Sequence, residues 1–288
     1  GEGRGNALVA LVQEDAILWS WHIWVTDAPQ TMAYENGVVF MDRNLGAVGT
    51  TVGGTDAYGM YYQWGRKDPF YWGTKTSTSA TPFDEVKELT VVNPAYAALT
   101  WSLAKAAVTP EAAAANPMTF YNNTVGTGSN WLAKPSAKLW GEAKTLNDPC
   151  PPGYKVPDID AWENLSSGRD YIDGVSAWDV ENYGVTYTYN GQTAWYPGQG
   201  YRMYSTGAIV GQRRFGRLLV VEGDGGQGLL PVCQEADQHV RVDQSGAGRT
   251  PLLWLHGALL QGVAAVMTEK MQGSERGPAF RFLGERPI

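Results

Sequence analysis

The side chains that could carry out chemistry are few in this sequence, and they are scattered. The three histidines, His22, His239 and His256, lie far apart, and no Cys/His spacing matches that of a zinc site. A histidine in an alternating, half-buried strand is more often a hydrogen-bonded structural residue than a ligand, and we interpret His22 in this way. We therefore expect no metal site and no cofactor, and we expect the protein not to be an enzyme.

Two other segments contain residue types that bind ions or phosphate. Gly49–Gly54 is a glycine-rich loop, but no Gly-Lys-Ser/Thr follows it, so a phosphate-binding loop is not expected. Asp158, Asp160 and Glu163 could be calcium ligands, but they lack EF-hand spacing. We interpret these three acidic residues as the cap and the solvated first turn of a helix.

Aromatic residues are the better candidates for ligand binding. They lie on or beside an expected hairpin, where flat rings could stack on sugar faces or anchor a protein partner. In the alternative interpretation, most of these rings pack the core of a loop-rich domain. The candidate residues are Tyr187, Tyr189, Trp195, Tyr196 and Tyr201.

The segment that must organise the surrounding structure runs from Asn147 to Leu165, with the sequence NDPCPPGYKVPDIDAWENL. Two prolines impose an extended backbone and Gly153 permits a turn, after which a short strand ends at Pro157. Asp158 is a good N-cap for a helix in which Trp162 packs against Pro157. We assign structural roles to Cys150, Gly153, Pro157, Asp158 and Trp162.

Alternating and turn-bounded patterns predict β-structure on both sides of this segment. Asn6–Asp27 is typical of a hairpin, and Gly37–Arg43 of a strand. Gly59–Phe70 indicates a buried strand or a short helix ending at Lys67-Asp68-Pro69. Trp178–Tyr204 contains a hairpin with a type I′ turn at Asn190-Gly191.

The region from about 77 to 130 is rich in Ala, Thr, Pro and Asn. We predict a long inserted loop there, with short helices at Tyr96–Ala107 and Glu111–Ala115.

Composition and charge narrow the class of protein further. The formal net charge of −7 argues against a nucleic-acid partner, and 288 residues suffice to bury a core. Glycine, tryptophan and tyrosine are plentiful and only 18% of residues are charged, as is typical of extracellular binding modules. No apolar run reaches membrane-spanning length and no segment resembles a signal peptide, so we expect no membrane insertion by this chain.

The two cysteines, Cys150 and Cys233, allow at most one internal disulfide. We favour a lone buried thiol at Cys150, and a Cys150–Cys233 bond is the alternative.

Five motifs that occur in order resemble the Fibrobacter succinogenes major paralogous domain, a family found in surface proteins of Bacteroidetes. The family is similar to the C-type-lectin-like superfamily. The resemblance implies an α+β fold with short antiparallel sheets, one or two helices, and long loops that carry the binding face. The motifs are MDRNLGA (41–47), YYQWGRKDPF (61–70), LWG (139–141), DPCPPGYKVP (148–157) and GYRMYSTGA (200–208).

This resemblance implies a non-enzymatic, extracellular or cell-surface module for binding or adhesion that recognises a glycan or a protein. Such a module would be part of a longer surface or fimbria-associated protein. One alternative is a structural spacer without its own ligand, and another is a ligand-binding protein diversified by a retroelement. Oxidase or hydrolase chemistry on the same scaffold is a third, because the family also resembles formylglycine-generating enzymes. The paired active-site cysteines of those enzymes have no match in this sequence.

The character of the chain changes after residue 211. All tyrosines lie before this point, and most arginines lie after it. We therefore divide the chain into a lectin-like domain, residues 1–211, and an atypical C-terminal part, residues 212–288.

A shift of the reading frame accounts for this change. Read one base out of frame, Phe215–Val221 can encode Ser-Gly-Asp-Tyr-Trp-Ser-Ser, and Trp254–Leu259 can encode Gly-Phe-Thr-Val-Arg-Cys, as the family has there. Gln227–Cys233 can likewise encode Lys-Ala-Tyr-Tyr-Leu-Tyr-Val. Our hypothesis is an out-of-frame translation after about Gln212, and the alternative is a natural divergent tail. The coding DNA distinguishes the two.

Overall fold

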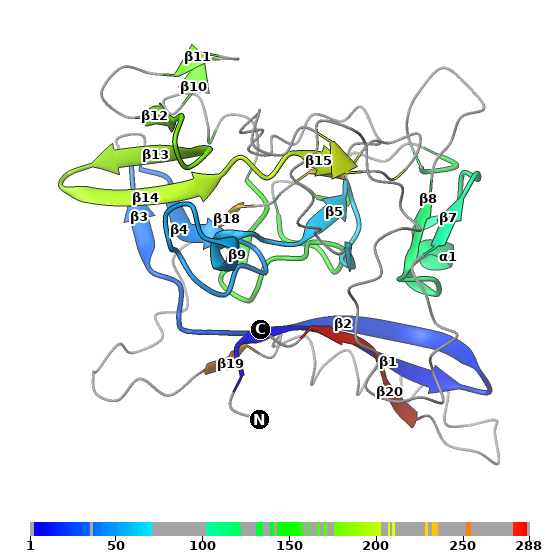
Figure 1. Cartoon of the computed structure of the whole chain (residues 1–288). Helices are drawn as coiled ribbons and strands as arrows, with labels where there is room; N and C mark the ends of the chain where they lie inside the picture. The colour runs from blue at the N-terminus through cyan, green and yellow to red at the C-terminus, as the bar shows by residue number, and fades with distance from the viewer. Residues whose placement is uncertain are drawn as a thin grey trace.

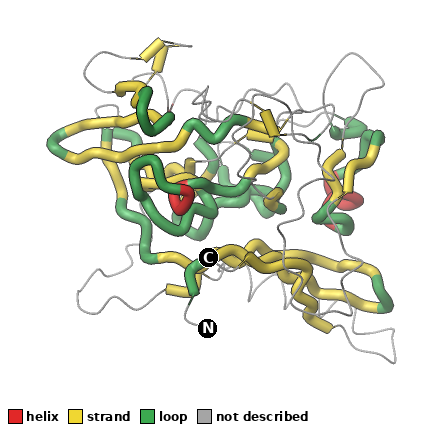
Figure 2. Tube along the Cα trace, viewed as in Figure 1, coloured by secondary structure: helices red, strands yellow, loops and turns green. Residues whose placement is uncertain are grey.

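Strands predominate among the residues that the computed structural model describes, where two short helical segments accompany them, η1 (Thr55–Ala57) and α1 (Pro110–Ala114) (Figures 1 and 2). The described part consists mostly of short antiparallel strands with very little helix. It therefore agrees with the expected α+β fold only in being a mixed, β-rich structure. No helix among the described residues is long and apolar enough to cross a membrane. The structure describes residues 3–34, 37–70, 102–121, 131–134, 139–140, 143–157, 161, 166–167, 170–171, 176–202, 207, 209–210, 228–229, 232–235, 252–254 and 279–286.

The expected N-terminal hairpin is present. Strands β1 (Gly5–Gln13) and β2 (Ala16–Thr26) pair antiparallel. Glu14 and Asp15 form the turn with φ of 49° and 68°, the left-handed geometry that matches the twist of a two-residue hairpin. Strands β19 (Leu252–Trp254) and β20 (Ala279–Arg286) extend the sheet at its two edges, giving the order β19-β2-β1-β20 (Figure 1).

Side chains on one face of β2 form hydrogen bonds that connect this sheet to the rest of the protein. Ser20 donates to Asp68 Oδ1 at 2.6 Å, and the Trp24 indole donates to the carbonyl of Ala47 at 2.9 Å. Since side chains two apart share one face of a strand, the polar contacts line up along one side of β2.

Two sheets form the body of the molecule, with the orders β3-β4-β18-β9 and β16-β15-β17-β5-β6 and antiparallel neighbours throughout. Each sheet includes one strand from beyond residue 212, β18 or β17. The strands are β3 (Thr31–Ala33), β4 (Val39–Asn44), β5 (Tyr61–Gln63), β6 (Pro69–Phe70), β9 (Tyr154–Lys155), β15 (Tyr201–Arg202), β16 (Ile209–Val210), β17 (Gly228–Leu229) and β18 (Val232–Glu235).

A second hairpin lies over β3 and β4 (Figure 1). Its turn residues Asn190 and Gly191 have φ of 48° and 75°, which confirms the predicted type I′ turn. The hairpin joins β13 (Gly184–Tyr189) to β14 (Gln192–Pro197), and β12 (Ser176–Asp179) pairs with β13. The short strands β10 (Ser166–Ser167) and β11 (Asp170–Tyr171) pair with each other.

The described part of the predicted insertion is ordered around Arg66. The helix expected at Glu111–Ala115 is confirmed as α1 (Pro110–Ala114), which Thr109 caps. The helix expected at Tyr96–Ala107 is wrong where it is described, because Ser102–Ala104 is strand β7, parallel to β8 (Thr119–Tyr121).

The guanidinium of Arg66 is buried and donates to carbonyls of this insertion. A buried cation needs such partners, and an unpartnered one would be costly, so Arg66 fixes the position of α1 and β8. The accepting carbonyls belong to Ala113, Asn116, Pro117 and Thr119.

Candidate functional site

Three of the five aromatic residues predicted to bind ligand are buried. The exposed fractions of Tyr187, Trp195 and Tyr196 are 2%, 5% and 2%. Tyr187 packs edge to face on both Tyr34 and Tyr196, with ring centroids 6.1 Å and 5.8 Å apart. The alternative of core packing therefore holds for these three rings, and they are not presented for stacking on a ligand.

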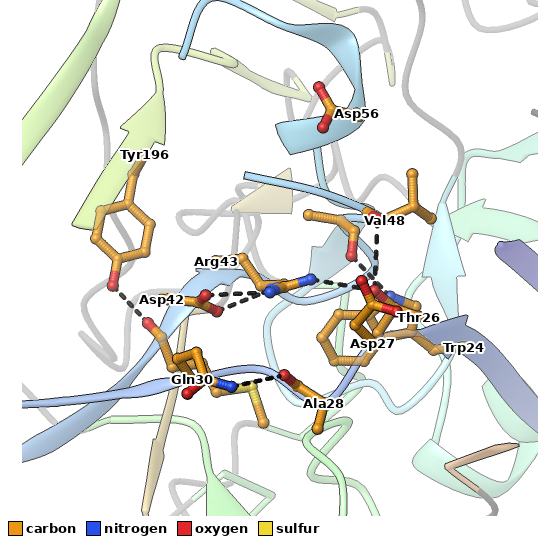
Figure 3. Close-up of polar contacts among 12 residues, drawn as sticks. Trp24, Thr26, Asp27, Ala28, Gln30, Asp42, Arg43, Val48, Asp56 and Tyr196 are labelled. Atoms are coloured by element: carbon orange, nitrogen blue, oxygen red, sulfur yellow. Dashed lines mark hydrogen bonds and ion pairs between the residues drawn. The ribbon is translucent and has the colours of Figure 1, made fainter. Parts of the chain in front are cut away.

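Tyr196 also has a polar role in the interior. Its hydroxyl donates to the carbonyl of Met41 in β4 (Figure 3). Burial raises the pKa of this phenol well above its ordinary value, so the hydroxyl remains a donor at physiological pH. Close by, Arg43 lies between Asp42 and Thr26 and joins β4 to the end of β2 (Figure 3).

The two remaining candidates are half-buried. Tyr189 lies 6.3 Å from Tyr34, measured between ring centroids, at the edge of the same aromatic cluster. Tyr201 is the first residue of β15. Neither position forms an exposed stacking platform with the buried rings of the hairpin.

The Asp-Pro-Cys-Pro-Pro-Gly-Tyr segment is folded around the buried carboxylate of Asp148. Its two oxygens accept the backbone N–H groups of Cys150 and Val156, each at 2.9 Å. Lys144 donates to Oδ1 at 2.9 Å and balances the charge. Gly153 has φ of +83°, as the predicted turn requires. The carboxylate thereby closes the loop that leads into β9.

Cys150 is disulfide-bonded, so the preferred interpretation of a lone thiol is wrong. Its sulfur is fully buried beside the main core, and Cys233 in β18 is the only other cysteine of the chain. Pro157 follows β9 and is buried, as its structural assignment requires. The assignments of Asp158 and Trp162 lie outside the described residues.

No group of three or more metal-ligating side chains occurs within the described ranges. The candidate calcium ligands Asp158, Asp160 and Glu163 fall outside those ranges. The Gly49–Gly54 loop folds instead around Asp56, whose carboxylate accepts the hydroxyl of Thr51 at 2.8 Å and whose carbonyl accepts the N–H of Gly49 at 2.9 Å. This carboxylate shapes the loop.

A surface that sequence reasoning missed lies where this loop meets the turn before β13. Val52 is 53% exposed, Val180 is 70% exposed and Tyr183 is 38% exposed. The loops touch at Gly53, where an added Cβ would come within 2.6 Å of Asn182 Oδ1. We call Val52, Gly53, Val180, Asn182 and Tyr183 the two-loop surface.

The backbone beneath the two-loop surface is held rigidly. Asp179 Oδ1 accepts the N–H groups of Glu181 and Asn182 at 3.0 Å and 2.9 Å, and Oδ2 accepts the Asn182 amide at 2.8 Å. These hydrogen bonds lower the pKa of Asp179 below its ordinary value.

Tyr183 is thereby kept at φ of 58°, an outlier for a bulky side chain. Its N–H donates to the carbonyl of Asp179, and its own carbonyl accepts from Gly198. The aromatic side chain is therefore presented from a strained backbone that hydrogen bonds fix on both sides.

Only part of this surface has a signal in the sequence. An Asp three residues before an Asn is typical of a turn, but the approach of the loop at Gly53 depends on tertiary packing. The arrangement exposes two valine side chains and an aromatic ring on neighbouring loops, a composition that is typical of interaction surfaces. Comparisons of the chain with protein-family models, with curated proteins and with solved structures find no match.

Proposed function

We propose that the protein is a non-enzymatic extracellular binding module that recognises a glycan or protein ligand through the two-loop surface. The observation that carries this proposal is the exposed ring of Tyr183 on a backbone that Asp179 fixes in a strained conformation. Strain of this kind costs about 1–3 kcal/mol and persists where the surrounding structure enforces it, commonly at functional sites.

The grouping of exposed apolar side chains supports the same conclusion. Large hydrophobic side chains with more than a third of their surface exposed are Val52, Leu103, Leu146, Val180 and Tyr183 in the described portion of the chain. Three of these five belong to two loops that touch. Single exposed apolar residues are ordinary, whereas grouped ones mark interaction sites.

Rigidity favours binding over a purely structural role for these loops. A side chain that is already fixed loses little conformational entropy when a ligand covers it. The hydrogen bonds of Asp179 and the contact of Gly53 with Asn182 provide this preorganisation.

We also propose a lectin-like fold and a cell-surface location, and both rest on the five sequence motifs. Four of these motifs contribute strands to the body sheets: MDRN ends β4, YYQ forms β5, Tyr154-Lys155 forms β9 and Tyr201-Arg202 forms β15. The buried Arg66 and Asp148, which organise the insertion and the turn before β9, also come from motif segments.

The second candidate function is that of a structural spacer, which the burial of the hairpin's aromatic rings favours. The rings of Tyr187, Trp195 and Tyr196 stabilise the core and are not exposed to a ligand. A spacer of this kind would show no saturable binding to any glycan or protein.

A glycan array and a panel of purified surface proteins, probed with the full chain, separate the two functions. Tyr183→Asn removes the ring while keeping a residue that tolerates the left-handed backbone. Leu146→Asn is the matched control, because Leu146 is 68% exposed and belongs to neither loop. We expect binding that Tyr183→Asn reduces at least about tenfold and Leu146→Asn leaves unchanged. Absence of saturable binding, or equal loss in both variants, contradicts the proposal.

A further inference from the structure

We propose that the two-loop surface binds a protein segment in which an apolar side chain lies next to an arginine or a lysine. The inference rests on the proposed function, because it names the class of ligand for that same surface. Two observations carry it. Exposed apolar side chains form the surface, and the charged residues of both loops are all acidic.

The exposed side chains of the two-loop surface offer mainly apolar contact. Val52 and Val180 are both more than half exposed, and their side chains present only methyl groups. The amide nitrogen of Asn182 donates to Asp179 Oδ2 at 2.8 Å, and Asn182 Oδ1 lies against Gly53, so this amide is already engaged within the surface. A ligand that covers the two valines gains free energy chiefly by removing apolar area from water.

A glycan suits such a surface less well than a protein does. Sugar hydroxyl groups need new hydrogen-bond partners when they leave water, and each group without a partner costs about 1–3 kcal/mol. The methyl groups of Val52 and Val180 provide no such partner. An apolar side chain of a protein loses no hydrogen bond when it covers them.

Negative charge surrounds the apolar side chains. Residues 48–59 contain Asp56, residues 176–199 contain Asp179 and Glu181, and neither range contains a lysine, an arginine or a histidine. Within the part of the chain that the structure describes, none of these three carboxylates belongs to an ion pair. A cationic partner is therefore complementary to the two loops, whereas an acidic protein or an anionic sugar would be repelled.

Two arginines lie on the elements next to the first loop, and both have acidic partners. Arg4 donates to the carbonyl of Val48 at 3.3 Å and pairs with Asp27. Arg43 in β4 pairs with Asp42, with its Nε 2.8 Å from Oδ1 (Figure 3). Because each of these cations is balanced by its own carboxylate, neither cancels the negative charge of the two loops.

Tyr183 allows one residue of the partner to use both properties of the surface. Its ring is partly exposed, and it follows the exposed Glu181 in the turn that Asp179 fixes. A guanidinium can stack on a tyrosine ring through its flat face and still interact with a neighbouring carboxylate. The surface thus favours arginine over lysine, and tyrosine with arginine is a frequent pair among the residues that dominate protein binding.

Selection from a library of random peptides displayed on phage tests this class of ligand. The full chain is the bait, and peptides that also bind the Tyr183→Asn variant are removed. We expect the selected peptides to combine leucine, isoleucine, valine or phenylalanine with arginine or lysine. Selected peptides that are acidic or lack a cation, or no selection above background, overturn the inference.

The tightest-binding selected peptide then tests the role of charge. Glu181→Gln removes one carboxylate charge while keeping the side chain's shape, and it should weaken affinity about two- to fivefold. Glu14→Gln is the matched control, because Glu14 is also exposed but lies in the turn between β1 and β2. Raising the salt concentration from about 0.05 to 0.5 M should weaken binding, and less so in Glu181→Gln. Equal effects of the two substitutions, or no effect of either, overturn the inference.

Failure of this inference and failure of the proposed function give different results. Saturable glycan binding that Tyr183→Asn reduces, with no peptide selected, overturns the protein ligand and leaves the binding function in place. Absence of saturable binding to peptides, glycans and purified surface proteins alike overturns both.

Discussion

The side-chain amide of Asn182 lies directly against the backbone of Gly53, so two loops far apart in sequence form one surface. One loop folds around Asp56 and the other around Asp179. In both cases a carboxylate that accepts local hydrogen bonds determines the loop conformation. The consequence is that Val52, Val180 and Tyr183 are exposed on a surface of fixed geometry.

Gly53→Ala should disturb this surface specifically. The position has φ of +72°, and the new Cβ would meet Asn182 Oδ1 at 2.6 Å, so the Asn182 side chain must shift away from Gly53. Gly37→Ala is the matched control, because Gly37 has φ of +78° and no atom within 4 Å. Both changes should lower the free energy of unfolding by about 1 kcal/mol, since both force alanine into the left-handed region. Only Gly53→Ala should weaken ligand binding in a titration, and equal weakening in both would refute the contact.

Asp179→Ala should release Tyr183 from its strained backbone. The change removes the acceptor of two backbone N–H groups and of the Asn182 amide, so ligand affinity should fall several-fold. Asp179→Asn keeps one oxygen acceptor and should retain more affinity.

The pH dependence of binding follows from the lowered pKa of Asp179. A carboxylate with a depressed pKa contributes above its ordinary value of 3.8 and loses its contribution only as the pH falls through the lowered value. Binding isotherms should therefore show no Asp179-dependent loss down to about pH 4. Suppose instead that binding weakens between neutral pH and about pH 4, and that Asp179→Asn abolishes this weakening. That result would contradict the assignment of a lowered pKa to Asp179.

Asp148→Ala should destabilise the turn before β9. The change leaves the buried N–H groups of Cys150 and Val156 and the ammonium of Lys144 without their acceptor, at a cost of about 3 kcal/mol. Urea unfolding measures this loss. Lys144→Met should cost less, about 1 kcal/mol, because Asp148 keeps its two N–H donors. The reverse order of the two losses would show that the turn does not depend on the carboxylate.

The disulfide at Cys150 gives an independent prediction. Peptide mapping without reductant should recover the Cys150 peptide joined to the Cys233 peptide, because the chain has no other cysteine. Reduction should lower the free energy of unfolding by about 2–4 kcal/mol, since the bond limits the conformations of the unfolded chain. Recovery of two unlinked, alkylated peptides from unreduced protein would contradict the bond.

Local turn chemistry made both hairpins predictable from the sequence. Asn190-Gly191 tolerates left-handed backbone angles, Gln13-Glu14-Asp15 is a polar turn, and alternating residues on each side of both turns indicate strands. The same is true of Gly153, whose positive φ permits the predicted turn before β9.

Tertiary contacts determined what the sequence could not predict. Aromatic residues of β13 and β14 are buried because Tyr196 reaches the carbonyl of Met41, 155 positions away along the chain. Ser102–Ala104 forms a strand because β8 pairs with it, whereas its local composition indicated a helix. The two-loop surface depends likewise on the meeting of Gly53 with Asn182.

Chemical-shift mapping with the strongest ligand from the glycan array or protein panel tests the central claim most directly. Backbone amide resonances of the full chain would be followed during titration with that ligand. We predict that the largest shifts occur at residues 51–54 and 179–183 and saturate with one affinity, and that Tyr183→Asn removes them. Largest shifts at the buried hairpin residues 185–196 or at the β1–β2 sheet, with the two loops unaffected, would contradict a binding site on the two-loop surface.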